Sequence, residues 1–188
     1  WIEASSGGAS SLNDLTDVLY DTTGGDKNLF VGQIPSSIEG GAGSNTGVGV
    51  NALDSITAGD DNTAYGNQAL TALTSGVRNT AVGSQSLKSV DTGLDNTAVG
   101  AYSFQNLQSN GYSIRNTAIG RSAGSSLTSG QNNTLIGFNA QASAVGVNNE
   151  FVLGDANVSV LRCQQSSISA LSDIRDKKNI VKINKALE

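Results

Sequence analysis

Residues 62–66 read Asn62-Thr63-Ala64-Tyr65-Gly66, and this pentapeptide recurs along the chain in near-identical copies. The pattern Asn-Thr-(Ala/Gly/Leu)-(Val/Ile/Tyr)-Gly occurs six times in 188 residues. Its copies begin at Asn45, Asn62, Asn79, Asn96, Asn116 and Asn133, so the successive steps are 17, 17, 17, 20 and 17 residues. Degenerate copies begin one step outside this run, at Asn28 and Glu150. Repetition of this kind, with divergent terminal copies, is typical of a stacked repeat protein.

Each repeat predicts a short β-strand followed by a second apolar segment. Alternate side chains of a strand point to opposite faces, so Thr63 and Tyr65 would share one face and Ala64 the other. The motif glycine supplies the backbone freedom that a corner needs. Seventeen residues are too few for a helical pair. We therefore predict an all-β fold, a parallel β-solenoid or β-roll of about eight 17-residue coils, with the asparagines bonded from coil to coil.

The composition excludes several classes of function. The chain has no histidine, which excludes a histidine-based triad and a histidine metal site, and the single Cys163 cannot form an internal disulfide. Turn chemistry explains the aspartates at Asp60, Asp61, Asp91 and Asp95, so we expect no metal and no cofactor. The net charge of −5 without a basic stripe disfavours nucleic acid as a partner. The absence of a long apolar run disfavours membrane insertion.

The repeat region, residues 28–154, resembles two kinds of fibrous protein. One is the head of trimeric autotransporter adhesins, in which repeats of the type Ser-Val-Ala-Ile-Gly form a parallel β-roll in three chains. The other is the shaft of phage tail fibres and tail spikes, built from Asn-Thr-Ala-x-Gly units. Both resemblances imply a homotrimer. We expect three chains to bury the Leu/Ala column of the second segment, because a single thin coil would leave an apolar face wet.

The C-terminal residues favour the phage family. Residues 172–180 read Ser-Asp-Ile-Arg-Asp-Lys-Lys-Asn-Ile, which resembles the opening of the intramolecular chaperone domain of phage tail spikes and endosialidases. That resemblance implies self-cleavage at Leu171–Ser172, with Ser172 as the nucleophile and Lys177 as its general base. The lysine would need a lowered pKa to accept the serine proton. Asp176 stands where the family usually has an apolar residue.

The domain organisation follows from these two resemblances. We expect an N-terminal connector at residues 1–27, the repeat shaft at 28–154, a linker at 155–170, and the truncated start of the chaperone domain at 171–188.

A receptor site is suggested by the one repeat that is three residues longer. It contains three of the nine aromatic residues, and Tyr102, Tyr112 and Arg115 are candidate receptor-binding residues there. The simpler alternative is a local bulge in which Phe104 takes the place of the repeat leucine and packs inward.

The function that these observations favour is structural. We expect an extracellular segment of a virion tail fibre that contributes to host attachment. Its partners would be two further copies, other tail or fibre proteins, and a host surface glycan or protein receptor. The alternative is the head of a trimeric adhesin at a bacterial cell surface. We expect no enzyme activity beyond a single self-cleavage.

Overall fold

The computed structural model describes residues 18–20, 27–32, 35, 38, 41–108 and 113–162. The described residues contain short strands joined by turns and no helix. The strands are β1 (Val18–Tyr20), β2 (Leu29–Gly32), β3 (Thr46–Gly49), β4 (Thr63–Tyr65), β5 (Thr80–Val82), β6 (Thr97–Val99), β7 (Thr117–Ile119), β8 (Thr134–Ile136) and β9 (Phe151–Leu153).

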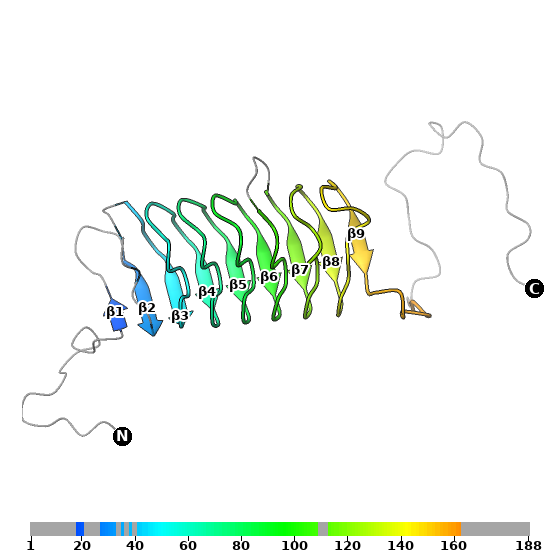
Figure 1. Cartoon of the computed structure of the whole chain (residues 1–188), viewed down its shortest axis with the longest axis horizontal. Helices are drawn as coiled ribbons and strands as arrows, with labels where there is room; N and C mark the ends of the chain where they lie inside the picture. Colours follow the sequence, from blue (N-terminus) through cyan, green and yellow to red (C-terminus); the bar gives the residue numbers. More distant parts are fainter. Residues whose placement is uncertain are drawn as a thin grey trace, which may run out of the picture. The chain divides into compact units, whose positions relative to one another are not determined.

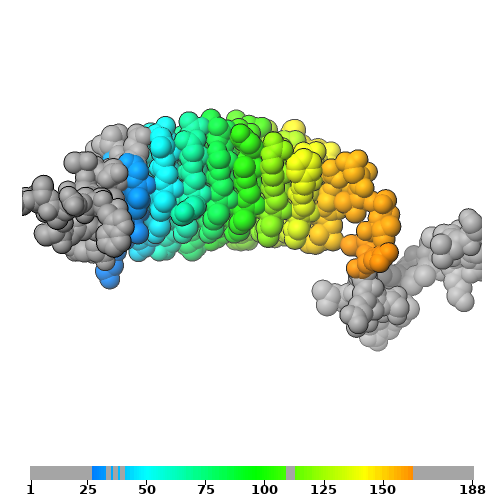
Figure 2. All heavy atoms as spheres, turned by 90° about the horizontal axis from the view of Figure 1, so that it is seen from below, coloured from blue at the N-terminus to red at the C-terminus, as the bar shows by residue number. Residues whose placement is uncertain are grey.

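These strands form one sheet in sequence order, β1 to β9 (Figure 1). From β2 to β9 every neighbouring pair is parallel, and each residue pairs with its counterpart one repeat later, as Thr63 does with Thr80. The 20-residue step does not disturb this register, because Thr97 still pairs with Thr117. The prediction of an all-β parallel solenoid is confirmed, but β2 to β9 enclose about seven complete turns instead of the predicted eight coils. Figure 2 shows the coils as neighbouring bands of atoms in sequence order.

The first strand departs from the repeat. β1 pairs antiparallel with β2, so that Leu19 lies opposite Phe30. This pairing gives hydrogen-bond partners to the backbone groups along the edge of β2, which would otherwise be open to another strand. The solenoid therefore begins with a reversed strand that covers its first edge.

The core lies inside each coil. The middle residue of the strands from β4 to β7 is a fully buried alanine, and the second segment adds a pair of buried apolar side chains in successive coils, as in Leu70 and Leu73. The expectation that the Leu/Ala column is left for packing between chains is therefore wrong. A 17-residue coil closes on itself, and its own backbone surrounds this column.

The second segment consists of two consecutive tight turns with residues in the left-handed region. Leu53, Leu70 and Leu87 have φ of 54°, 51° and 48°. This conformation is costly for a leucine, and the surrounding coils hold it there. Leu70 donates its N–H to the carbonyl of Ser86 in the next coil and accepts from the N–H of Leu73.

Large and small residues compensate one another between coils. Phe104 takes the leucine position, is fully buried, and faces Gly124, where an added Cβ would lie 2.3 Å from the Phe104 ring. The inward packing of Phe104 that the sequence offered as the simpler alternative is thus confirmed. At the other end Phe30 faces Gly47 in the same way, with 2.7 Å to an added Cβ.

The motif asparagines form a fully buried ladder through the coils. In each step, the Oδ1 atom of one asparagine accepts from the backbone N–H and the side-chain Nδ2 of the next, as Asn62 does from Asn79 at 2.9 and 3.1 Å. Each Nδ2 also donates to a carbonyl of its own coil, as from Asn79 to Gly93 at 2.7 Å. Glu150 ends the ladder: its N–H bonds Asn133, and its carboxylate accepts from the N–H of Ser143. The predicted bonding from coil to coil is confirmed.

Candidate functional site

The outer face of the sheet carries an exposed apolar stripe. We use this name for the column of residues before each motif glycine, from β3 to β8: Val48, Tyr65, Val82, Val99, Ile119 and Ile136. Tyr65 is 59% exposed and Ile119 is 42% exposed. A threonine column runs beside it on the same face, and neither column contains a charge. Parallel strands are about 4.8 Å apart, so the stripe repeats at that interval over about 25 Å.

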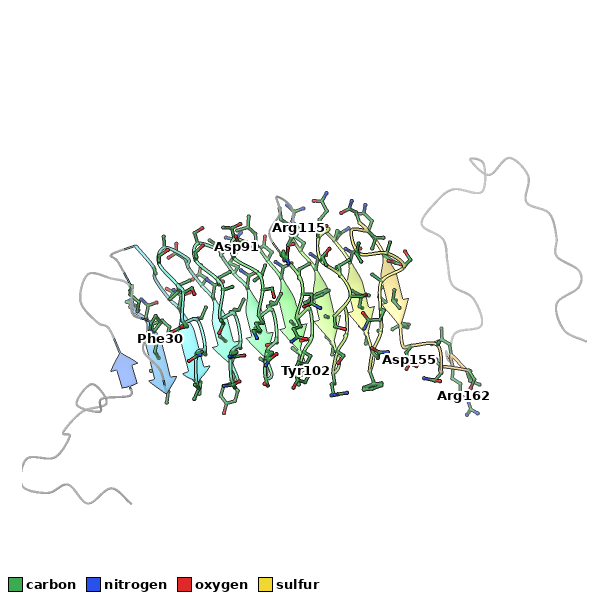
Figure 3. The ribbon with its side chains drawn as sticks, in the orientation of Figure 1. Phe30, Asp91, Tyr102, Arg115, Asp155 and Arg162 are labelled. Atoms are coloured by element: carbon green, nitrogen blue, oxygen red, sulfur yellow. The ribbon has the colours of Figure 1, made fainter. Side chains whose placement is uncertain are left out.

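One edge of the solenoid carries alternating charges. This edge is formed by the residue before each motif asparagine. Arg115 lies at the upper edge in Figure 3, and Asp61, Arg78 and Asp95 hold the same position in the three preceding coils. Arg78 Nε lies 2.6 Å from Asp95 Oδ1. The hydrogen bond from Arg78 holds the pKa of Asp95 below its usual value, and the charge of Arg115 acts in the same direction. The same hydrogen bond raises the pKa of Arg78.

The opposite, lower edge carries a stacked group of aromatic and cationic side chains. This edge is formed by the residues that directly follow the motif glycines, which in the last three coils are Arg121, Phe138 and Asp155. Tyr102 lies one position later in the sequence of its own coil. Arg121 Cζ lies 5.8 Å from the centroid of the Tyr102 ring and 5.7 Å from that of Phe138. Both distances are within cation–π range. We call Tyr102, Arg121 and Phe138 the aromatic clamp.

A hollow of about 480 Å³ lies at the last coil. Its lining includes Asn139 and Gln141 from the turn after β8, and Gly154 and Asp155 after β9. Asn139 follows Phe138 directly in the chain, so the hollow continues the lower edge beyond the clamp. The carboxylate of Asp155 accepts hydrogen bonds from the N–H and Nδ2 of Asn157, at 3.0 and 2.9 Å.

The structure does not bring the predicted receptor residues together. Tyr102 lies at the lower edge and Arg115 at the upper edge, as Figure 3 shows. Tyr112 lies outside the described residues. Arg115 belongs to the charged column, whereas Tyr102 contacts Arg121.

Sequence reasoning missed Arg121 and Phe138. Both occupy the position after the motif glycine, which in earlier repeats holds Val50, Asn67, Ser84 and Ala101. The signal was present in the alignment of the repeats, because a bulky residue appears at this variable outer position in two consecutive coils. Only the register between coils places Tyr102 beside them.

The proposed self-cleavage residues Ser172 and Lys177 lie outside the described residues, as does the Leu171–Ser172 bond. In the part of the chain that the structure describes, no group of three or more metal-ligating side chains is found. Nor do those residues include a helix with the length and apolar character needed to span a bilayer.

Comparison with known proteins found no matching family model, no matching curated protein and no matching solved structure.

Proposed function

We propose that the chain is a shaft segment of an extracellular fibre of the phage tail-fibre kind, that it works as a homotrimer, and that it contributes to host attachment. The observation that carries the proposal is the apolar stripe on the outer face of the sheet. Valine and isoleucine side chains that are more than a third exposed in one coil after another form a continuous patch, and such patches mark interaction surfaces.

A second copy of the same chain is the occupant that fits this face. The stripe repeats once per coil, so a partner must offer apolar groups at the same interval, which another solenoid does. The face is uncharged although the chain carries a net charge of −5, so copies can approach there without facing like charges. Contact along the whole length would exclude water from about six stripe residues per chain, and their burial stabilises association through the hydrophobic effect.

Light scattering on the purified chain tests the trimer. The expected mass is about three times 19.1 kDa. Val82→Asp and Val99→Asp place an uncompensated carboxylate on the stripe, so each should shift the trimer toward monomer. Asn67→Asp is the matched control, because it adds the same charge at an exposed position of the lower edge. Circular dichroism confirms that the variants keep their β-structure. A monomeric parent chain, or stripe variants that stay trimeric, would refute this assembly.

The maturation step is tested separately. In protein expressed from its full reading frame, Ser172→Ala removes the proposed nucleophile and Lys177→Ala removes its base, so each should leave an uncut trimer. Mass spectrometry identifies the cut bond. Cleavage of the Ser172→Ala protein, or cleavage at a bond other than Leu171–Ser172, would contradict the proposed maturation and leave the trimer result unaffected.

A further inference from the structure

We propose that the aromatic clamp and the adjoining hollow bind an acidic saccharide, with Arg121 contacting its carboxylate. This inference gives a ligand class to the attachment role proposed above and rests on it for its biological setting. The binding itself is a property of the lower edge of one chain.

Arg121 is an exposed cation available to an anion. No carboxylate lies within ion-pair distance of it among the described residues, whereas Arg78 on the upper edge is paired with Asp95. Its side chain forms no hydrogen bond to the described part of the chain, so its N–H donors can be offered to a ligand. Contacts with two rings restrict the guanidinium and leave less conformational freedom to be lost on binding. A planar guanidinium pairs with a carboxylate through two parallel hydrogen bonds.

The two rings provide surfaces for the apolar faces of sugar units. Phe138 is 59% exposed, whereas Phe30 and Phe104 are fully buried, and Tyr102 is partly exposed beside it. Phe151 is also exposed, but it belongs to β9 and does not contact Arg121 in the described contacts. A sugar ring has C–H groups on its faces and hydroxyls at its rim, so it can lie on an aromatic ring while its rim meets polar groups. Aromatic surface combined with a few polar groups is the usual make-up of a ligand site.

The hollow supplies the polar groups. Asn139 provides an amide, and Asp155 provides a carboxylate that can accept bonds from hydroxyls. The amide of Gln141 is already bonded to Ser122, Ser125 and Ser126, and it holds this wall of the hollow in place. Its volume of about 480 Å³ is within the ordinary range of small-ligand sites. The negative charge of Asp155 disfavours a second anion there. The ligand we infer thus carries its carboxylate at Arg121 and a neutral, hydroxyl-bearing unit in the hollow.

A nucleic acid is a poorer fit to the same edge. Its backbone carries a charge at every nucleotide and needs several cations in a row. The lower-edge column offers Arg121 alone, followed by Phe138 and then Asp155, in a chain of net charge −5. A saccharide with spaced carboxylates meets this pattern.

The test uses immobilised oligosaccharides that contain hexuronate or sialate units, together with the same oligosaccharides after reduction of their carboxyl groups to alcohols. The intact chain should bind at least one carboxylated probe and bind its reduced form about tenfold more weakly or worse. Arg121→Gln and Phe138→Ala should each weaken that binding by about tenfold or more. Arg115→Gln is the matched control, because it removes the same charge from the opposite edge, and it should change binding less than about twofold.

Three results of the binding assay would overturn the site: no binding to any carboxylated probe, equal binding to the reduced probes, or unchanged binding by Arg121→Gln. Light scattering on the same samples separates this proposal from the previous one. If Arg121→Gln abolishes the trimer, the lower edge is a contact between copies and the saccharide site is refuted. If the parent chain is monomeric and still binds through Arg121, the trimeric shaft is refuted and the saccharide site stands.

Discussion

Replacing Asn79 with alanine removes one step from the buried asparagine ladder. The Asn79 side chain donates to Asn62 Oδ1 at 3.1 Å and to the Gly93 carbonyl at 2.7 Å. It accepts from the backbone N–H and the Nδ2 of Asn96, at 3.1 and 3.0 Å. The side chain is fully buried, so water cannot replace these partners without opening the coil.

The cost can be estimated from what remains bonded after the change. Asn62 Oδ1 keeps the Asn79 N–H, the Gly93 carbonyl keeps the N–H of Val77, and Asn96 Nδ2 keeps the Ser113 carbonyl. The backbone N–H of Asn96 loses its acceptor. One orphaned buried donor costs about 1–3 kcal/mol, and the remaining lost bonds add about 0.5–1.5 kcal/mol each. With one orphaned donor and three further lost bonds, we expect Asn79→Ala to lower the free energy of unfolding by about 3–7 kcal/mol.

Urea unfolding followed by circular dichroism, at a fixed protomer concentration, measures this loss. Asn67→Ala is the matched control, because the Asn67 side chain is exposed and makes only a 3.5 Å contact with the Val50 carbonyl. It should change the free energy of unfolding by less than about 0.5 kcal/mol. If the two variants unfold alike, the ladder does not hold the coils together and this reasoning fails.

Three further outcomes follow from the geometry, each measured by urea unfolding. Gly83→Ala should lower the free energy of unfolding by at least about 2 kcal/mol. The reason is that φ at Gly83 is +131° and the new Cβ would lie 2.6 Å from the backbone of the next coil. A variant as stable as the parent chain would contradict that close approach. Gly124→Leu should destabilise the protein, because the new side chain would collide with Phe104. Adding Phe104→Leu should relieve this collision, so the double variant should be more stable than the sum of the two single effects by at least about 1 kcal/mol. Additive effects would show that the two sites are independent. Because Arg78 lowers the folded-state pKa of Asp95, that carboxylate contributes stability above its unfolded-state pKa and loses it as pH falls through the folded-state value. Asp95→Asn should therefore slightly reduce stability at pH 7 and leave it unchanged at low pH, and since the pair is exposed, high salt should erase the difference.

The repeat made much of the fold predictable. The spacing of the pentapeptide implied parallel stacking in register, and the alternation within Thr-Ala-Val implied that alanine lies on the face opposite threonine and valine. The position of Phe104 in the leucine column implied its burial. The left-handed conformation of Leu70 was not predictable, because leucine rarely adopts it and only the surrounding coils enforce it.

The candidate site was less predictable. Tyr102 and Arg115 are close in sequence, and this proximity suggested one site. A coil turns the chain through a full circuit, and these two residues fall on its opposite edges. Tyr102 and Arg121 are nineteen positions apart, and stacking makes them neighbours.

By itself the sequence determined the period, the strand positions and the asparagine column, because these depend on residues that recur at a fixed interval along one chain. Only the tertiary structure decided which apolar column is enclosed and which is exposed. That choice depends on how a coil closes around its interior, and the leucines are enclosed while the valines and isoleucines of the stripe are left outside. The aromatic clamp likewise exists only after stacking, because its three side chains come from three successive coils.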